Sequence, residues 1–188
     1  MPPKNKVTRE QIVQAAMQMV CRDGMEILNA RALAAEIGCS TQPIFSNFST
    51  MEELRTAIIQ EAFAQYHACQ RQAREREELP PYKASGLAYI RFAVDRPQLF
   101  RLLFMCSRTE QQMTATSSEL EEVVAIIRAA TGYSHEKALR FHLEQWAFVH
   151  GIAVMLVTSY LTLTWPQIDA AMTDVYQGLR SRFDAMQD

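Results

Sequence analysis

The chain has 188 residues, and 48% of them are hydrophobic, which is typical of a globular protein and excludes a disordered one. Lys and Arg (19) nearly balance Asp and Glu (21), so the net charge of −2 does not indicate a nucleic-acid partner by itself. Only six glycines interrupt a sequence rich in Ala, Leu, Gln, Glu and Arg, and we therefore predict an all-α protein.

The cysteines and the apolar runs indicate the compartment. The cysteines form no CxxC pair and no secretory signal precedes them, so we expect reduced thiols in a cytoplasmic protein. The most apolar stretch, 146–163, is interrupted by His150 and Gly151 and reads as a buried helix instead of a membrane span. No cofactor is expected. The four cysteines are Cys21, Cys39, Cys69 and Cys106.

A capping box opens the first predicted helix, over about residues 8–23. Thr8 can cap the helix while the side chain of Gln11 reaches back to the cap, and apolar residues recur behind them with helical periodicity. Gly24 suits the left-handed stop after such a helix.

Two short helices follow with a tight turn between them. Asn29 can cap the second helix, which Gly38 ends. Ser40 is predicted to cap the third helix, with Pro43 in its first turn, and this helix ends near Asn47. Two short helices joined by a turn that contains glycine predict a helix-turn-helix.

Six further helices make a total of about nine. The polar stretch 107–117 lacks periodicity and is predicted to be a loop. We expect a DNA-binding domain over residues 1–50, a connector at the start of the fourth helix, and a ligand-sensing and dimerisation domain over 51–188. The six helices are predicted over about 50–78, 82–95, 97–106, 118–130, 134–163 and 166–185.

The spacing of residues 9–54 is more specific than a lone helix-turn-helix. It reads R-x-x-I-x-x-A-A, then G, then A-L-A-x-x-I-G-C-S-x-x-x-I-F-x-x-F. This pattern resembles the N-terminal domain of the TetR family of repressors over about residues 8–56. The matching residues are Arg9, Ile12, Ala15, Ala16, Gly24, Leu33, Ala34, Ile37, Gly38, Ser40, Ile44, Phe45, Phe48, Glu53 and Leu54.

The resemblance implies a DNA-binding surface around the third helix. In a helix-turn-helix the first turn of the second helix enters the major groove, where Gln42 can pair with adenine and Thr41 can contact a thymine methyl. Helix N-termini and basic side chains can hold phosphates. The candidate DNA-binding residues are Lys4, Lys6, Asn29, Arg31, Ser40, Thr41, Gln42, Phe45 and Asn47.

Two positions depart from the family pattern. The family commonly has Tyr where this chain has Phe45, and Lys where it has Met51. Both changes remove a potential phosphate contact while leaving the fold intact. They keep open an alternative, in which the chain is a TetR-fold sensor or adaptor with weakened or no DNA binding.

The C-terminal half resembles a TetR subclass named for a Trp–His–Gly pattern, here Trp146, His150 and Gly151, with a second matching stretch at 89–104. The resemblance implies an apolar inducer pocket and a homodimer through the eighth and ninth helices. Ordinary core packing is the alternative for each pocket residue, and a backbone carbonyl is the alternative partner for His150. The candidate ligand-binding residues are Phe63, Tyr66, Phe92, Leu99, Leu103, Met105, Trp146, His150 and Met155.

Together these patterns predict a ligand-responsive transcriptional regulator, and we expect it to act as a repressor. It would bind a palindromic operator in double-stranded DNA as a dimer and be released by a small apolar inducer of unknown identity. An enzyme is not expected, because the sequence has no HExxH, no glycine-rich phosphate loop and no GxSxG, and no third ligand joins His142 and His150 at metal-binding spacing.

Overall fold

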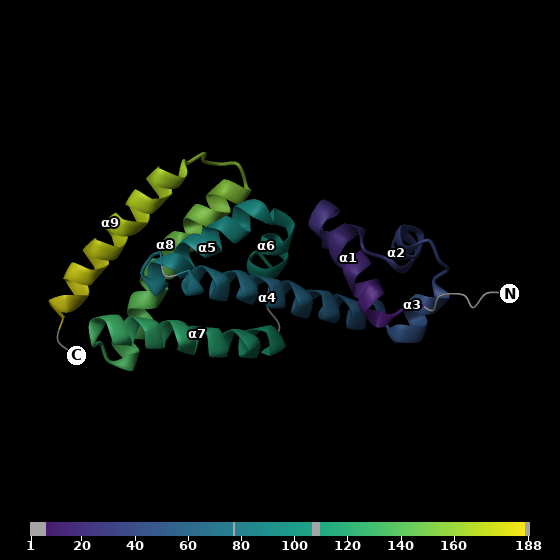
Figure 1. Ribbon diagram of the computed structural model, residues 1–188, viewed down its shortest axis with the longest axis horizontal. Coiled ribbons are helices and arrows are strands. Elements are labelled where there is room, and N and C mark those ends of the chain that lie inside the picture. Colours follow the sequence, from purple (N-terminus) through teal and green to yellow (C-terminus); the bar gives the residue numbers. More distant parts are fainter. Residues whose placement is uncertain (1–6, 77, 107–109, 187–188) are drawn as a thin grey trace. The chain divides into compact units, whose positions relative to one another are not determined.

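The computed structural model describes residues 7–76, 78–106 and 110–186, with the backbone alone described over 110–118. In these ranges all regular structure is helical, with nine α-helices and one 3₁₀ turn, which confirms the predicted fold class (Figure 1). The elements are α1 (Arg9–Asp23), the 3₁₀ turn (Met25–Ile27), α2 (Ala30–Ile37), α3 (Gln42–Asn47), α4 (Met51–Glu75), α5 (Pro81–Asp95), α6 (Pro97–Phe104), α7 (Glu110–Thr131), α8 (His135–Val157) and α9 (Trp165–Asp184).

The chain divides into two compact units, and α4 contributes to both. The described part of unit 1 comprises residues 7–68 and 96–106, which include α1, α2, α3 and α6. The described part of unit 2 comprises residues 69–95 and 110–186, which include α5, α7, α8 and α9.

The predicted start of α1 is confirmed. The Gln11 backbone N–H donates to Thr8 Oγ1 at 3.2 Å, and the Thr8 N–H donates to Gln11 Oε1 at 2.9 Å, which completes the capping box. Gly24 follows the helix with a φ of 90°, a conformation that glycine adopts without steric cost. Local capping signals therefore set both ends of this helix.

The helix-turn-helix forms as predicted, except at the start of α3. Asn29 caps α2 through Oδ1, and Gly38 ends it in the left-handed conformation. The prediction that Ser40 caps α3 is wrong. Thr41 is the cap residue and already has helical backbone angles, and its carbonyl accepts from the Phe45 N–H at 3.2 Å, so the helix begins later.

Two boundaries in the second half differ from the prediction. Helix α7 begins at Glu110, so 110–117 is helical where a loop was expected, while 107–109 lie outside the described residues. Helix α8 ends at Val157 instead of near 163. Ser159 takes a left-handed φ of 56° there, and the Tyr160 N–H returns to the Met155 carbonyl at 2.9 Å.

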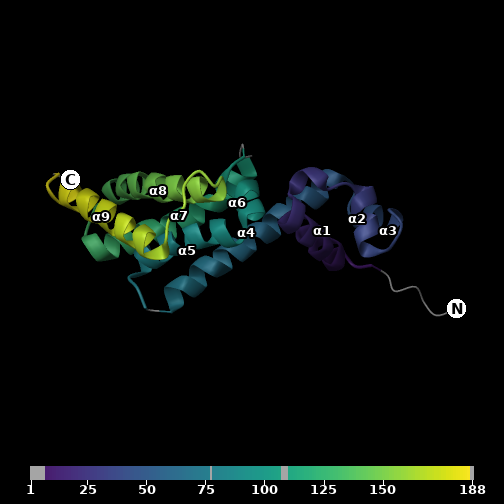
Figure 2. The ribbon, with the colours of Figure 1, turned by 90° about the horizontal axis from the view of Figure 1, so that it is seen from above.

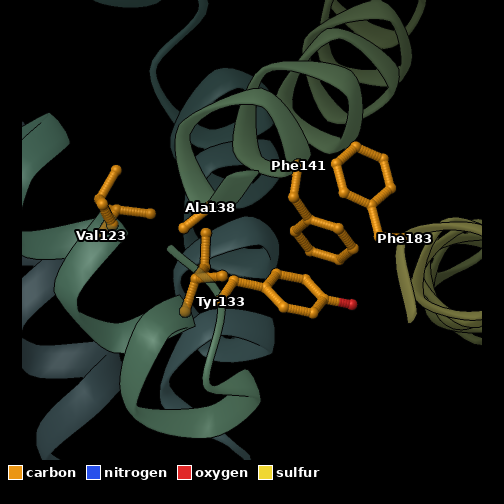
Figure 3. Packing of buried hydrophobic residues seen from close by; sticks show 7 residues of the cluster. Val123, Tyr133, Ala138, Phe141 and Phe183 are labelled. Atoms are coloured by element: carbon orange, nitrogen blue, oxygen red, sulfur yellow. The ribbon is translucent and has the colours of Figure 1, made fainter. Parts of the chain in front are cut away.

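An aromatic cluster forms the core where α7, α8 and α9 meet (Figure 3). Phe141 of α8 meets Phe183 of α9 edge-on, with ring centroids 5.3 Å apart. The Tyr133 ring packs on both, and its hydroxyl donates to Asp184 at 2.6 Å. This network fixes the end of α9 against the turn that leads into α8.

Helices α5 and α8 run side by side in the same direction (Figures 1 and 2). The Tyr82 hydroxyl lies 3.1 Å from Nδ1 of His142, and the Tyr89 hydroxyl lies 2.8 Å from Nδ1 of His150. Both contacts pair successive turns of α5 with successive turns of α8. The two Tyr–His pairs therefore set the register between these helices.

Helix α5 also contacts α9 through side chains. Lys83 of α5 pairs with Asp169 of α9 at 2.7 Å, and a Cβ at Gly86 would meet the flexible Cε end of Met172 at 2.6 Å. Met172 is buried, as is Ile168 one turn before it. The core of unit 2 therefore occupies one face of α9.

The half-buried position of His142 generates a prediction about pH. Desolvation lowers the pKa of His142 to about 4, below the value of about 6.5 in an unfolded chain. Because the folded pKa is depressed, the stabilisation is present above pH 6.5 and is lost as the pH falls toward 4. His142→Asn keeps an acceptor for Tyr82 but cannot titrate. Between pH 7 and pH 4.5, the unfolding free energy of the parent should fall by about 2 kcal/mol more than that of this variant.

Urea unfolding followed by circular dichroism at both pH values measures this difference. His135→Asn is the matched control, because His135 is half exposed at the start of α8. Equal pH sensitivity in the parent and in His142→Asn would contradict the prediction.

Candidate nucleic-acid interface

Arg9 joins the beginning of α1 to the end of α3 and the beginning of α4. Its Nη1 donates to the Asn47 carbonyl at 2.8 Å and to Glu53 Oε1 at 2.9 Å. Its guanidinium lies 4.0 Å from the centroid of the buried Phe48 ring. We call these contacts the Arg9 clamp. The beginning of α1 thus meets the end of α3 and the beginning of α4, which lie 38 and 44 residues further along the chain, at one cation.

Glu53 completes the clamp. Its second carboxylate oxygen accepts the Ser49 N–H at 2.8 Å, and the Glu53 N–H donates to Thr50 Oγ1 at 3.1 Å. The hydrogen bond from the Ser49 backbone, followed by that from Arg9, lowers the pKa of Glu53. The carboxylate that Arg9 binds is therefore ionised at neutral pH.

Helix α3 is anchored on one face and exposed on the other. Ile44 and the adjoining Phe48 are fully buried, whereas Gln42 is exposed and Thr41 is half-buried. Phe45, one turn after Thr41, is 50% exposed. Of the two residues predicted to face DNA bases, Gln42 therefore lies on the surface at the leading end of the helix, and Thr41 is partly covered.

The other predicted DNA-binding residues have different surroundings. Arg31 and Ser40 are exposed. The side chain of Asn29 is used in capping α2, with Oδ1 accepting the N–H groups of residues 31 and 32. The amide of Asn47 donates to the Pro43 carbonyl at 2.8 Å and to the Val7 carbonyl at 3.3 Å, so it orders the backbone around α3. Lys4 and Lys6 lie outside the described residues.

The predicted ligand-binding residues are divided between the two units. Unit 1 contains five of them: Phe63, Tyr66, Leu99 and Leu103, which are buried, and Met105, which is 41% exposed after the end of α6. Unit 2 contains four: Phe92, which is buried, and Trp146, His150 and Met155, which are half-buried.

In unit 1 the predicted aromatics pack with a residue that the sequence reasoning missed. The Phe104 ring meets Tyr66 edge-on, with centroids 5.0 Å apart, and lies 6.4 Å from Phe63. The apolar run at 99–104, with helical spacing, is the signal that could have identified Phe104.

In unit 2 the predicted Trp146–His150 pair forms a stack, with centroids 4.9 Å apart and ring planes 16° from parallel. Tyr89 of α5 meets Trp146 edge-on and contacts Nδ1 of His150 through its hydroxyl. Tyr89 was not among the predicted residues. This arrangement offers an aromatic surface with polar nitrogen and oxygen atoms beside it.

The described residues contain neither a candidate metal-binding cluster nor a candidate membrane-spanning helix. In that part of the chain, no three His, Cys, Asp or Glu side chains gather in a way that could hold a metal ion. Within the same ranges, no helix combines the length and apolarity needed to cross a membrane.

Comparison with known proteins gives concordant matches. Residues 82–177 match the family described as "Tetracyclin repressor-like, C-terminal domain". A helix-turn-helix-type transcriptional regulator of Mycobacterium tuberculosis is 23% identical over 175 residues, which cover 90% of this chain and 78% of the relative.

Two solved structures show the same fold. A TetR-like transcriptional regulator from Rhodococcus sp. RHA1 superposes with a TM-score of 0.66 at 14% identity, covering 95% of this chain and 96% of that one. A TetR variant from Acinetobacter baumannii AYE in complex with minocycline gives a TM-score of 0.61 at 18% identity, covering 97% and 99%.

The Arg9 clamp generates a prediction about stability. Arg9→Met keeps an unbranched apolar side chain but removes the cation, so the contacts to Asn47, Glu53 and Phe48 are lost together. We expect the thermal midpoint of unfolding to fall by about 2–4 °C, measured by circular dichroism at pH 7. Arg31→Met removes an exposed guanidinium from α2 and should leave the midpoint unchanged. An equal decrease in both variants would show that the clamp has no special role.

Proposed function

The chain belongs to the tetracycline-repressor-like (TetR) family of transcriptional regulators, and on this premise we propose that it is a repressor released from DNA by a small ligand. The observation that carries the proposal is the exposed leading turn of α3, which presents Thr41 and Gln42 on a face supported by buried Ile44. A helix end of this kind can enter a major groove and reach base edges.

We propose that residues 1–50 form the DNA-binding domain. Gln42 would pair with adenine, and Thr41 would contact a neighbouring base or its methyl group. Ser40 and Arg31 would contact phosphates from the exposed surface, with Lys4 and Lys6 adding contacts from the N-terminal arm. Asn29, Phe45 and Asn47 would support the same surface, the two asparagines chiefly by ordering the backbone around α2 and α3.

We propose that residues 51–188 sense the ligand and form the dimer. Dimerisation supplies the second helix-turn-helix that a palindromic operator requires. The side of α8 that carries Leu139 and Leu143 supports this role, because the side chains are 36% and 60% exposed while buried α8 residues such as Phe141 face the core. On α9 the half-buried Val175 and Leu179 would add to the interface.

Ligand control would act through an equilibrium between two states of the dimer. A ligand changes DNA affinity only to the extent that it binds one of these states more tightly. The minocycline complex of the similar TetR structure supports a small-molecule inducer. Trp146, His150, Phe92 and Met155 of unit 2 are the candidate contacts, and a regulator of this kind would act in the cytoplasm, where the operator is.

A sensor without DNA affinity remains the second candidate, and two residues favour it. Phe45 lacks the hydroxyl that commonly contacts phosphate in the family, and Met51 lacks the corresponding ammonium group. A mobility-shift titration with the intergenic DNA beside the gene distinguishes the two functions. It should begin at low salt, since phosphate contacts weaken steeply as salt rises. Specific binding supports the repressor; its absence at low salt supports the sensor.

Gln42→Ala tests base recognition by α3. Removing a bidentate contact to one base should reduce discrimination at that base pair by about tenfold or more, while the thermal midpoint stays unchanged. Competition binding with operator variants measures the discrimination. Gln18→Ala, at an exposed position on α1, is the matched control and should discriminate like the parent. Unaltered discrimination in Gln42→Ala would exclude this residue from base recognition.

Leu143→Glu tests the dimer. A carboxylate at position 143, on the side of α8 that also exposes Leu139, would have to be desolvated in the interface, so the variant should be monomeric at concentrations where the parent is dimeric. It should also bind the full operator less tightly. Analytical ultracentrifugation measures the first effect, and Val94→Glu, at a 45% exposed apolar position on α5, is the control. A dimeric Leu143→Glu would place the interface elsewhere.

A further inference from the structure

Three polar side chains are buried among the described residues, and all three belong to unit 2. They are Gln70, Ser85 and Gln145, with exposures of 4%, 8% and 4%. Buried polar side chains in proteins almost always have hydrogen-bond partners. Each of these three residues therefore calls for a physical reason to be in the core.

Gln145 lies in the middle of the buried stripe of α8. Phe141 precedes it by one turn and Val149 follows it by one turn, and both are buried. The Oε1 atom of Gln145 is inaccessible to solvent and accepts no hydrogen bond from any described residue. An acceptor held in this way costs stability that an apolar side chain of the same size would not cost.

The register of α5 and α8 locates this acceptor. The Tyr82–His142 and Tyr89–His150 pairs lie on either side of it, and residue 145 follows His142 by the same three positions by which Ser85 follows Tyr82. Gln145 is therefore level with Ser85 along the two parallel helices. The Ser85 carbonyl accepts from Gln70 Nε2 at 3.2 Å. We call Gln70, Ser85 and Gln145 the polar layer, because the first two are bonded and the third lies at the same level along α8.

The charges around the layer indicate the charge of a ligand. Arg74 Nη1 lies 3.4 Å from Ser85 Oγ, so a cation adjoins the layer, and its partner Glu122 is a largely exposed residue 3.2 Å away. No Asp or Glu is buried among the described residues. A cationic ligand would thus meet no buried counter-charge, whereas a neutral hydroxyl or N–H group could satisfy Oε1.

We propose that Gln145 Oε1 is the specificity-determining acceptor of the ligand site, and that it selects neutral, largely apolar molecules bearing one hydroxyl or N–H donor. This inference rests on the proposed function of unit 2 as the sensing domain. The ligand donor satisfies the buried oxygen, and the apolar body of the ligand packs among the residues that flank the layer. Gln145 thus discriminates between ligands of equal size and apolarity.

Three probes with the same ring system test the proposal: 2-naphthol, 2-methoxynaphthalene and 2-naphthylmethylammonium. Fluorescence anisotropy of each probe gives its affinity for the full-length protein. We expect 2-naphthol to bind about tenfold more tightly than the methyl ether, and the cation to bind more weakly than the naphthol. In Gln145→Met the naphthol-to-ether ratio should fall to about one. Gln72→Met, at an exposed position on α4, should keep the parent ratio.

Thermal unfolding without ligand provides a second measurement. Gln145→Met should raise the thermal midpoint by about 2–4 °C, because it removes a buried acceptor that has no donor. A lowered midpoint together with an unchanged naphthol-to-ether ratio would show a merely structural role and overturn the proposal. Equal binding of naphthol and ether by the parent, preference for the cation, or no binding of any probe would also overturn it.

Operator binding by the same protein samples separates this inference from the proposed function. Retained operator binding without a preference for the naphthol contradicts the role of Gln145 alone. Loss of operator binding at low salt contradicts the repressor function, whatever the probes show.

Discussion

The position of α3 in the helix-turn-helix depends on the Arg9 clamp. One guanidinium binds a backbone carbonyl at the end of α3, a carboxylate at the start of α4 and the face of Phe48. An exposed ion pair contributes little stability by itself, so the importance of this one is geometric. It holds the trailing end of α3 against α1, and Ile44 anchors the middle of the helix. The leading end, with Gln42, stays exposed on the surface.

Unit 2 uses two hydrogen bonds between α5 and α8 for the same purpose. The Tyr82–His142 and Tyr89–His150 pairs align the two helices. Burial keeps His142 neutral by lowering its pKa to about 4, so that pair is uncharged across the physiological range. A rigid frame of this kind can hold an acceptor such as Gln145 Oε1 unpartnered until a ligand supplies the donor.

Helix caps and other local features could be predicted from the sequence, whereas contacts between residues distant in sequence could not. The Thr8 cap and the Asn29 cap depend on residues two or three positions away, so their patterns are legible in sequence. Helix α8 ends without a glycine or proline, and Ser and Thr residues obscured the early start of α7, so those boundaries were misplaced. In the site, the surface position of Gln42 followed from the helix-turn-helix resemblance, in which the first turn of the second helix faces the major groove. The contacts that engage Arg9 span 38 and 44 residues, and neither these nor the burial of Gln145 could be predicted without packing.

The parallel pairing of α5 with α8 also has a kinetic consequence. About sixty residues separate Tyr82 from His142 and Tyr89 from His150, so the central contacts of unit 2 are highly non-local. Non-local contacts slow folding, because a long loop must close before they form. During synthesis, the face of α5 that α8 covers stays uncovered until the ribosome has added those sixty residues. Unit 2 therefore completes its core late in synthesis, and the face of α5 that α8 covers is open to aggregation until then.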